Sequence, residues 1–153
     1  MKEKLGFVRL PIVLFVIFFI GRLALGAAQG VTKESYDNIN KLFSMVILQV
    51  HVGLLWGAAG RRFRGYKITE SMMAIALAVL ASQILIFVGT AGSYLLHANT
   101  VFTFPEALNQ TTATVDFGTA MVSRSITLVV NTIIGGILGA IGWALGGLIP
   151  EKD

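Results

Sequence analysis

Four long apolar stretches, each close to the length that crosses a lipid bilayer, constrain this fold more than any other feature of the chain. They occupy residues 8–28, 42–60, 71–96 and 126–149. A helix needs about 20 residues to cross roughly 30 Å of hydrocarbon. It also satisfies its backbone hydrogen bonds within the segment, as lipid requires. The sequence therefore predicts an all-α membrane protein with a single domain over residues 1–153, built as a four-helix transmembrane bundle.

The composition fits a membrane bundle and removes several classes of function. Apolar residues make up 55% of the chain, charged residues make up 13%, and the mean hydropathy is +0.77, which leaves too little charge to cover a soluble surface. The chain has no cysteine, which excludes disulfides, thiolate metal sites, iron–sulfur clusters and cysteine nucleophiles. The sequence has no Ser/His/Asp set, two-histidine metal motif or phosphate-binding loop. We therefore expect no autonomous enzyme and no required cofactor.

Basic residues flank some of the apolar stretches and predict how the chain is oriented. They precede the first stretch, fill the turn between the second and third, and follow the fourth: Lys2, Lys4, Arg9, Arg61, Arg62, Arg64, Lys67 and Lys152. Because cytoplasmic loops are rich in Lys and Arg, we expect both termini inside, in a prokaryotic cell membrane, with residues 97–125 as an external loop. This topology accounts for the net charge of +4 without a nucleic-acid partner. The basic turn, residues 61–67, is also a candidate contact for anionic lipid headgroups, worth about 1 kcal/mol per basic residue.

Glycine recurs at helical spacing in two of the stretches. The fourth stretch has four glycines at intervals of four, three and four residues, and the second has a pair four residues apart: Gly135, Gly139, Gly142, Gly146, Gly53 and Gly57. Glycine costs a helix about 1 kcal/mol relative to alanine, so such a seam indicates that another backbone approaches closely. We expect packing inside the bundle. The alternatives are an oligomer interface and a surface for a flat cofactor or lipid.

Strongly polar side chains inside a span are costly and are therefore candidates for function. The five most polar ones are Arg22, Gln49, His51, Gln83 and Asn131. Arg22 is the one formal charge away from the ends of the predicted spans, and no acidic residue lies in a span to pair with it. It either snorkels to the external headgroups or binds Asn131, Gln83 or a ligand anion inside the bundle.

His51 is the one histidine within a predicted span. A neutral imidazole hydrogen-bonded to its surroundings is the commoner use of such a residue. The alternative is axial ligation of a haem or a chlorophyll-type magnesium, for which Gly53 and Gly57 would leave room.

Local patterns predict where two helices begin and which surroundings the first helix contacts. Thr32 is a candidate cap for a helix that runs from residue 33 unbroken into the second span, and Asp116 is a candidate cap for an early start of the last helix. The first stretch has phenylalanines without a polar stripe, and we expect them to face lipid or a partner subunit: Phe15, Phe18 and Phe19.

These features leave three functions open. The leading hypothesis is a non-catalytic accessory subunit of a larger redox or energy-converting membrane complex, whose partners are the lipid bilayer and other membrane subunits or copies of itself. The first alternative is a small homo-oligomeric channel or transporter for a small solute or anion, with Arg22, Gln49, Gln83 and Asn131 along a polar path. The second is an electron-transfer subunit that binds haem or chlorophyll through His51.

Overall fold

The computed structural model of the chain describes residues 2–111 and 114–148, and no strand occurs among them. The elements are α1 (Lys2–Gln29), α2 (Lys33–Leu42), α3 (Met45–Arg64), α4 (Ile68–Leu95), the short 3-10 helix η1 (Pro105–Leu108) and α5 (Phe117–Gly146). Four segments are long and apolar enough to cross a membrane, with α2 and α3 together forming the second. The predicted all-helical protein with four apolar helical segments is confirmed.

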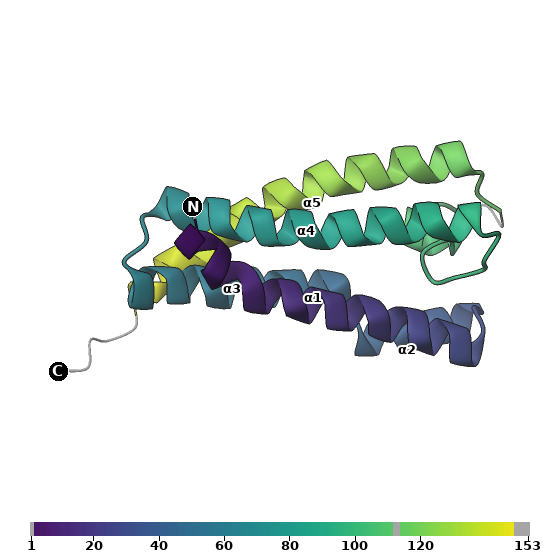
Figure 1. The fold of residues 1–153 in the computed structure, drawn as a ribbon, viewed down its shortest axis with the longest axis horizontal. Helices are drawn as coiled ribbons and strands as arrows, with labels where there is room; N and C mark the ends of the chain where they lie inside the picture. The colour runs from purple at the N-terminus through teal and green to yellow at the C-terminus, as the bar shows by residue number, and fades with distance from the viewer. Residues whose placement is uncertain (1, 112–113, 149–153) are drawn as a thin grey trace.

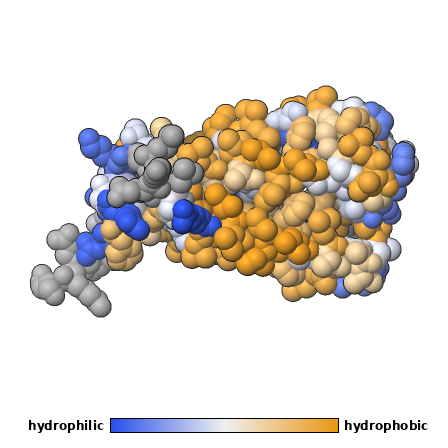
Figure 2. Space-filling view, in the orientation of Figure 1, coloured by the Kyte–Doolittle hydropathy of each residue, from blue (hydrophilic) through white to orange (hydrophobic). Residues whose placement is uncertain are grey.

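The helices form a bundle in which α4 lies between α1 and α5, while α3 packs on α5 (Figure 1). The start of α1, the α3–α4 turn and the end of α5 gather at one end, which we call the basic end. The other end, which we call the loop end, holds α2, η1 and the described residues 96–111 and 114–116. A belt of apolar side chains lies between two more polar ends (Figure 2). This belt is the surface that a membrane-spanning bundle presents to lipid.

The second predicted helix is broken, which corrects the expectation of an unbroken run from residue 33. Thr32 does cap α2, because its side chain accepts a hydrogen bond from the Ser35 backbone N–H. However, α2 ends at Leu42, and α3 starts again after Ser44, whose hydroxyl accepts from the backbone N–H of Ile47 at 3.3 Å. A new N-cap directly after a helix end marks a break rather than a bend.

The last helix begins nine residues before the predicted start of the fourth span at residue 126. Asp116 is its N-cap, and the carboxylate accepts a hydrogen bond from the backbone N–H of Thr119 at 3.0 Å. This early start moves Arg124 from the predicted external loop into α5, where only 8% of its surface is exposed. The predicted Asp116 cap is confirmed, and the helix starts earlier than residue 126 because the cap, and not hydropathy alone, sets the helix start.

The glycine seam lies inside the bundle. Gly142 and Gly146 face α3, and a Cβ on Gly146 would lie 2.6 Å from the carbonyl oxygen of Ala58. Gly135 and Gly139 face α4, and a Cβ on Gly135 would lie 2.7 Å from Cγ2 of Val79. On α3, Gly53 meets the side chain of Leu138, and Gly57 meets the backbone of α5. The seam thus draws α3, α4 and α5 together toward the basic end.

The phenylalanines of α1 pack inward, so the expectation that they face lipid or a partner is wrong. Phe15 is fully buried, Phe18 lies edge-on to Phe43, and Phe19 stacks on Phe102 with ring centroids 4.9 Å apart. The loop residue Phe102 supplies a partner that hydropathy along α1 could not reveal. These rings join α1 to the loop end.

Candidate anion-binding site

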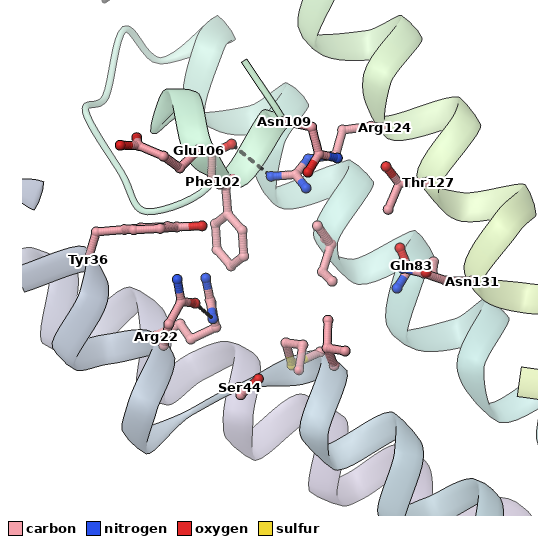
Figure 3. Close-up of a pocket in the computed structure, with 15 residues that line it drawn as sticks. Arg22, Tyr36, Ser44, Gln83, Phe102, Glu106, Asn109, Arg124, Thr127 and Asn131 are labelled. Carbon is pink, nitrogen blue, oxygen red and sulfur yellow. Dashed lines mark hydrogen bonds between the residues drawn. The ribbon is translucent and has the colours of Figure 1, made fainter. Parts of the chain in front are cut away.

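A polar cavity of about 210 Å³ lies at the loop end of the bundle (Figure 3). On one side are residues of α1, α2 and the first turn of α3, and on the other are residues of α4, η1 and α5. The polar side chains that line it are Arg22, Tyr36, Asn40, Ser44, Gln83, Glu106, Asn109, Arg124, Thr127 and Asn131. Such a concentration of polar groups inside an apolar belt marks a candidate site.

Arg22 reaches into this cavity from α1 and does not snorkel, because only 6% of its surface is exposed. One guanidinium nitrogen, Nη1, donates to Oδ1 of Asn40 at 2.6 Å and to the carbonyl oxygen of Phe43 at 3.1 Å. Phe43 is the C-cap of α2, so the positive charge lies at the negative end of that helix dipole. The Nε atom of Arg22 is buried and has no hydrogen-bond partner.

Arg124 reaches the same cavity from α5. Its Nε donates to Oγ1 of Thr90 at 2.9 Å, and its Nη2 donates to the carbonyl oxygen of Phe102 at 3.0 Å. The ring of Phe102 lies between the two arginines, with Cζ of Arg22 5.8 Å from its centroid (Figure 3). Arg22 lies seven residues before the end of α1 and Arg124 seven residues after the start of α5, so their depths in the bundle match.

The hydrogen bonds from both guanidiniums go to neutral oxygens, so the two positive charges are not compensated by them. Glu106 also lines the cavity, but it pairs with Lys33 at 3.1 Å, and both side chains are well exposed. A hydrogen bond from its own backbone N–H and the Lys33 ammonium hold the pKa of Glu106 below its ordinary value, so it stays ionised in that pair. Among the described residues, neither guanidinium is hydrogen-bonded to a carboxylate, which makes the cavity a candidate site for an anion.

Three of the four residues predicted for a polar path come together here. Arg22, Gln83 and Asn131 all line the cavity. Gln49 is buried outside it, and its Nε2 donates to Oγ of Ser82 at 2.8 Å, which ties α3 to α4. Sequence reasoning missed Arg124, although the Asp116 cap was a signal that it lies inside a helix.

The structure places His51 on the exposed side of α3, where its Nδ1 lies 2.8 Å from the carbonyl oxygen of Ile47 one turn earlier. Among the described residues, no group of three or more His, Cys, Asp or Glu side chains could hold a metal ion. His51 does not line the cavity, and axial ligation of a cofactor through it stays a prediction.

The basic turn lies at the opposite end from the cavity. Arg61 stacks on Trp143 of α5, with its Cζ 4.1 Å from the ring centroid, and donates to the Trp143 carbonyl oxygen. Arg62 is half-buried, whereas Arg64 and Lys67 are exposed. Arg61 thus stabilises the α3–α5 contact, and contact of the basic turn with headgroups stays a prediction.

Comparison with protein-family models, curated proteins and solved structures finds no match to this chain.

Proposed function

We propose that this chain is an integral membrane protein that binds a small anion between Arg22 and Arg124. The observation that carries this proposal is the pair of buried guanidiniums that line one cavity and bond only to neutral oxygens. Guanidinium groups bind carboxylate and phosphate oxygens through paired, charge-assisted hydrogen bonds. Burial strengthens that attraction, because the local dielectric is low.

The size of the cavity sets the size of the ligand. Pockets for drug-sized molecules measure roughly 300–1,000 Å³. At about 210 Å³, this cavity fits a small inorganic or organic anion, or an anionic headgroup. Hydroxyl and amide groups around the rim supply further donors, notably Tyr36, Thr127 and Asn131.

Access to the site is from the loop end. Toward the basic end, the glycine seam brings α3 and α5 into backbone contact at Gly57 and Gly142, which leaves no room for a ligand. With the orientation expected from the basic residues, the loop end faces the outside of the cell. The ligand is then taken from the external side of the membrane.

The accessory subunit expected from the sequence stays a separate proposal with less support. Two of the features that suggested it were the glycine seam and the phenylalanines of α1, and both make contacts within the bundle. Native mass spectrometry of protein extracted gently from its own membrane addresses it. Unrelated subunits at fixed stoichiometry would favour the accessory role.

The test of anion binding is thermal unfolding of the purified protein in mild detergent, with and without phosphate, sulfate or acetate. We expect at least one of these anions to raise the melting temperature. At an anion concentration of 100 times its dissociation constant, binding should add about 2.7 kcal/mol to the free energy of unfolding. Arg22→Gln and Arg124→Gln should lose this shift.

The matched control is Arg64→Gln, which removes an exposed positive charge at the basic end and should keep the shift. An unchanged melting temperature of the wild-type protein with all three anions would refute the proposal. An equal loss in Arg64→Gln would assign the effect to overall charge instead of the cavity.

A further inference from the structure

The cavity is open toward the membrane as well as toward the loop end. Val46, in the first turn of α3, lines the cavity and is also 62% exposed. Across from it, Thr127 and Asn131 of α5 line the cavity and are half-buried (Figure 3). The helices α3 and α5 touch at Gly53 and further toward the basic end. Beyond that contact, the cavity-lining residues Val46 of α3 and Asn131 of α5 also reach the outer surface of the bundle, and we call the space between them the lateral gap.

The surface next to this gap is apolar. On both helices, the residues that follow the gap expose large aliphatic side chains: Val46, Ile47 and Val50 on α3, and Val130, Ile133 and Ile134 on α5. A polar cavity that opens sideways onto apolar helix faces suits a molecule with a charged head and a hydrocarbon tail.

The charge of the cavity indicates the kind of head. Arg22 and Arg124 together carry two positive charges, and Arg22 keeps a buried Nε without a partner. A phosphate monoester carries about −1.5 to −2 charges at pH 7, whereas a carboxylate or a phosphate diester carries about one. The monoester is therefore the best match in charge, and its three free oxygens can accept from both guanidiniums.

We infer that the anion bound between Arg22 and Arg124 is the phosphate monoester head of a lipid, whose tail leaves through the gap between Val46 and Asn131. This inference rests on the proposed anion binding and adds that the ligand carries a hydrocarbon tail. The same phosphate chemistry is available from a soluble monoester, so the decisive comparison is between two ligands with the same head, one with a tail and one without.

The test compares dioctanoyl phosphatidic acid with glycerol 3-phosphate as ligands of the full-length protein in mild detergent, read by thermal shift across a concentration series. We expect phosphatidic acid to bind at least about tenfold more tightly, since tail contacts add to the same head. Dioctanoyl phosphatidylcholine, which has the tails but no net charge, should not shift the protein.

The gap is tested with Val46→Trp, which fills it, and its matched control is Leu55→Trp, an equally exposed position on the opposite face of α3 that does not line the cavity. Val46→Trp should weaken phosphatidic acid about tenfold and leave glycerol 3-phosphate unchanged. Leu55→Trp should change neither ligand. These variants leave both arginines in place, so they remain informative even where an arginine variant fails to fold.

The outcomes separate this inference from the proposed function. Equal affinity for the two phosphates would overturn the lipid assignment and leave anion binding standing. Equal binding of phosphatidylcholine would overturn it too, by showing that the tails alone are recognised. If neither phosphate nor any other anion binds, both proposals fall together.

Discussion

Asp116 decides where α5 begins and hence whether Arg124 reaches the cavity. Hydrogen bonds from the Thr119 hydroxyl, at 2.6 Å, and from the Thr119 backbone N–H hold the pKa of the Asp116 carboxyl below its ordinary value. The unfolded chain then binds a proton more readily than the folded one. The resulting stabilisation is present above the ordinary carboxyl pKa of about 3.9 and is lost as the pH falls through the lower folded value.

We therefore expect the wild-type protein to lose stability when the pH is lowered from about 6 to about 3, and Asp116→Asn to lose less. Asparagine can still accept a hydrogen bond at the cap, but it does not titrate in this range. The measurement is the melting temperature in detergent across this range. Identical slopes for the two proteins would mean that Asp116 does not contribute to the acid sensitivity.

The two arginines also show what sequence can and cannot reveal about single residues. Arg22 stands out because it interrupts an apolar stretch. Arg124 does not, because it lies among Ser and Thr residues at the polar edge of one. Its burial depends on the loop that folds back over α5 and places the Phe102 carbonyl within 3.0 Å of its guanidinium. A contact between segments that are far apart leaves no periodic signal in either one.

At the scale of elements, α3 and α5 approach each other so closely at their glycines that no Cβ fits between the backbones. A Cβ on Gly57 would lie 2.6 Å from the carbonyl oxygen of Gly139 and 3.0 Å from Cα of Gly142. Backbone atoms cannot move aside as a flexible side chain can, so even a methyl group must push the two helices apart.

Gly57→Ala should therefore destabilise the protein by about 1–3 kcal/mol. The matched control is Gly92→Ala in α4, where an added Cβ meets no atom within 4 Å. There the better helix propensity of alanine should leave stability equal or higher by up to about 1 kcal/mol. Unfolding of both variants in detergent gives the comparison, and a Gly57→Ala protein as stable as the wild type would show that α3 and α5 can separate at little cost.

The break between α2 and α3 shows where element boundaries escape sequence reasoning. The stretch from Lys33 onward has helical spacing throughout, yet α2 ends at Leu42. Arg22 of α1 binds the freed Phe43 carbonyl, so a residue on a different helix stabilises the break. Helix spacing predicted one unbroken helix across both segments, and tertiary contacts decided that it breaks at residues 43–44.

For the whole molecule, hydropathy was sufficient to predict four apolar helical segments and a belt around the bundle, because lipid imposes the same requirement on every residue of that belt. Orientation in the membrane remains a prediction from the positive-inside rule. Since the chain has no cysteine, single-cysteine variants can test it without background.

Asn99→Cys at the loop end and Arg64→Cys at the basic end are both at exposed positions and serve as each other's control. With both termini in the cytoplasm, a membrane-impermeant maleimide added to intact cells should label Asn99→Cys and not Arg64→Cys. After the cells are lysed, both should react. The reverse labelling pattern on intact cells would place the loop end in the cytoplasm, and the ligand would then be taken up from the cytoplasmic side.

The backbone contacts between α3 and α5 also bear on whether this protein can be a conduit. A passage between α3 and α5 toward the basic end would require the helices to separate at Gly57 and Gly142, where an added Cβ would lie within 3.0 Å of backbone atoms of the other helix. Under the proposed anion binding, the site is therefore a dead end, and we expect the ligand to leave on the side of the membrane from which it came.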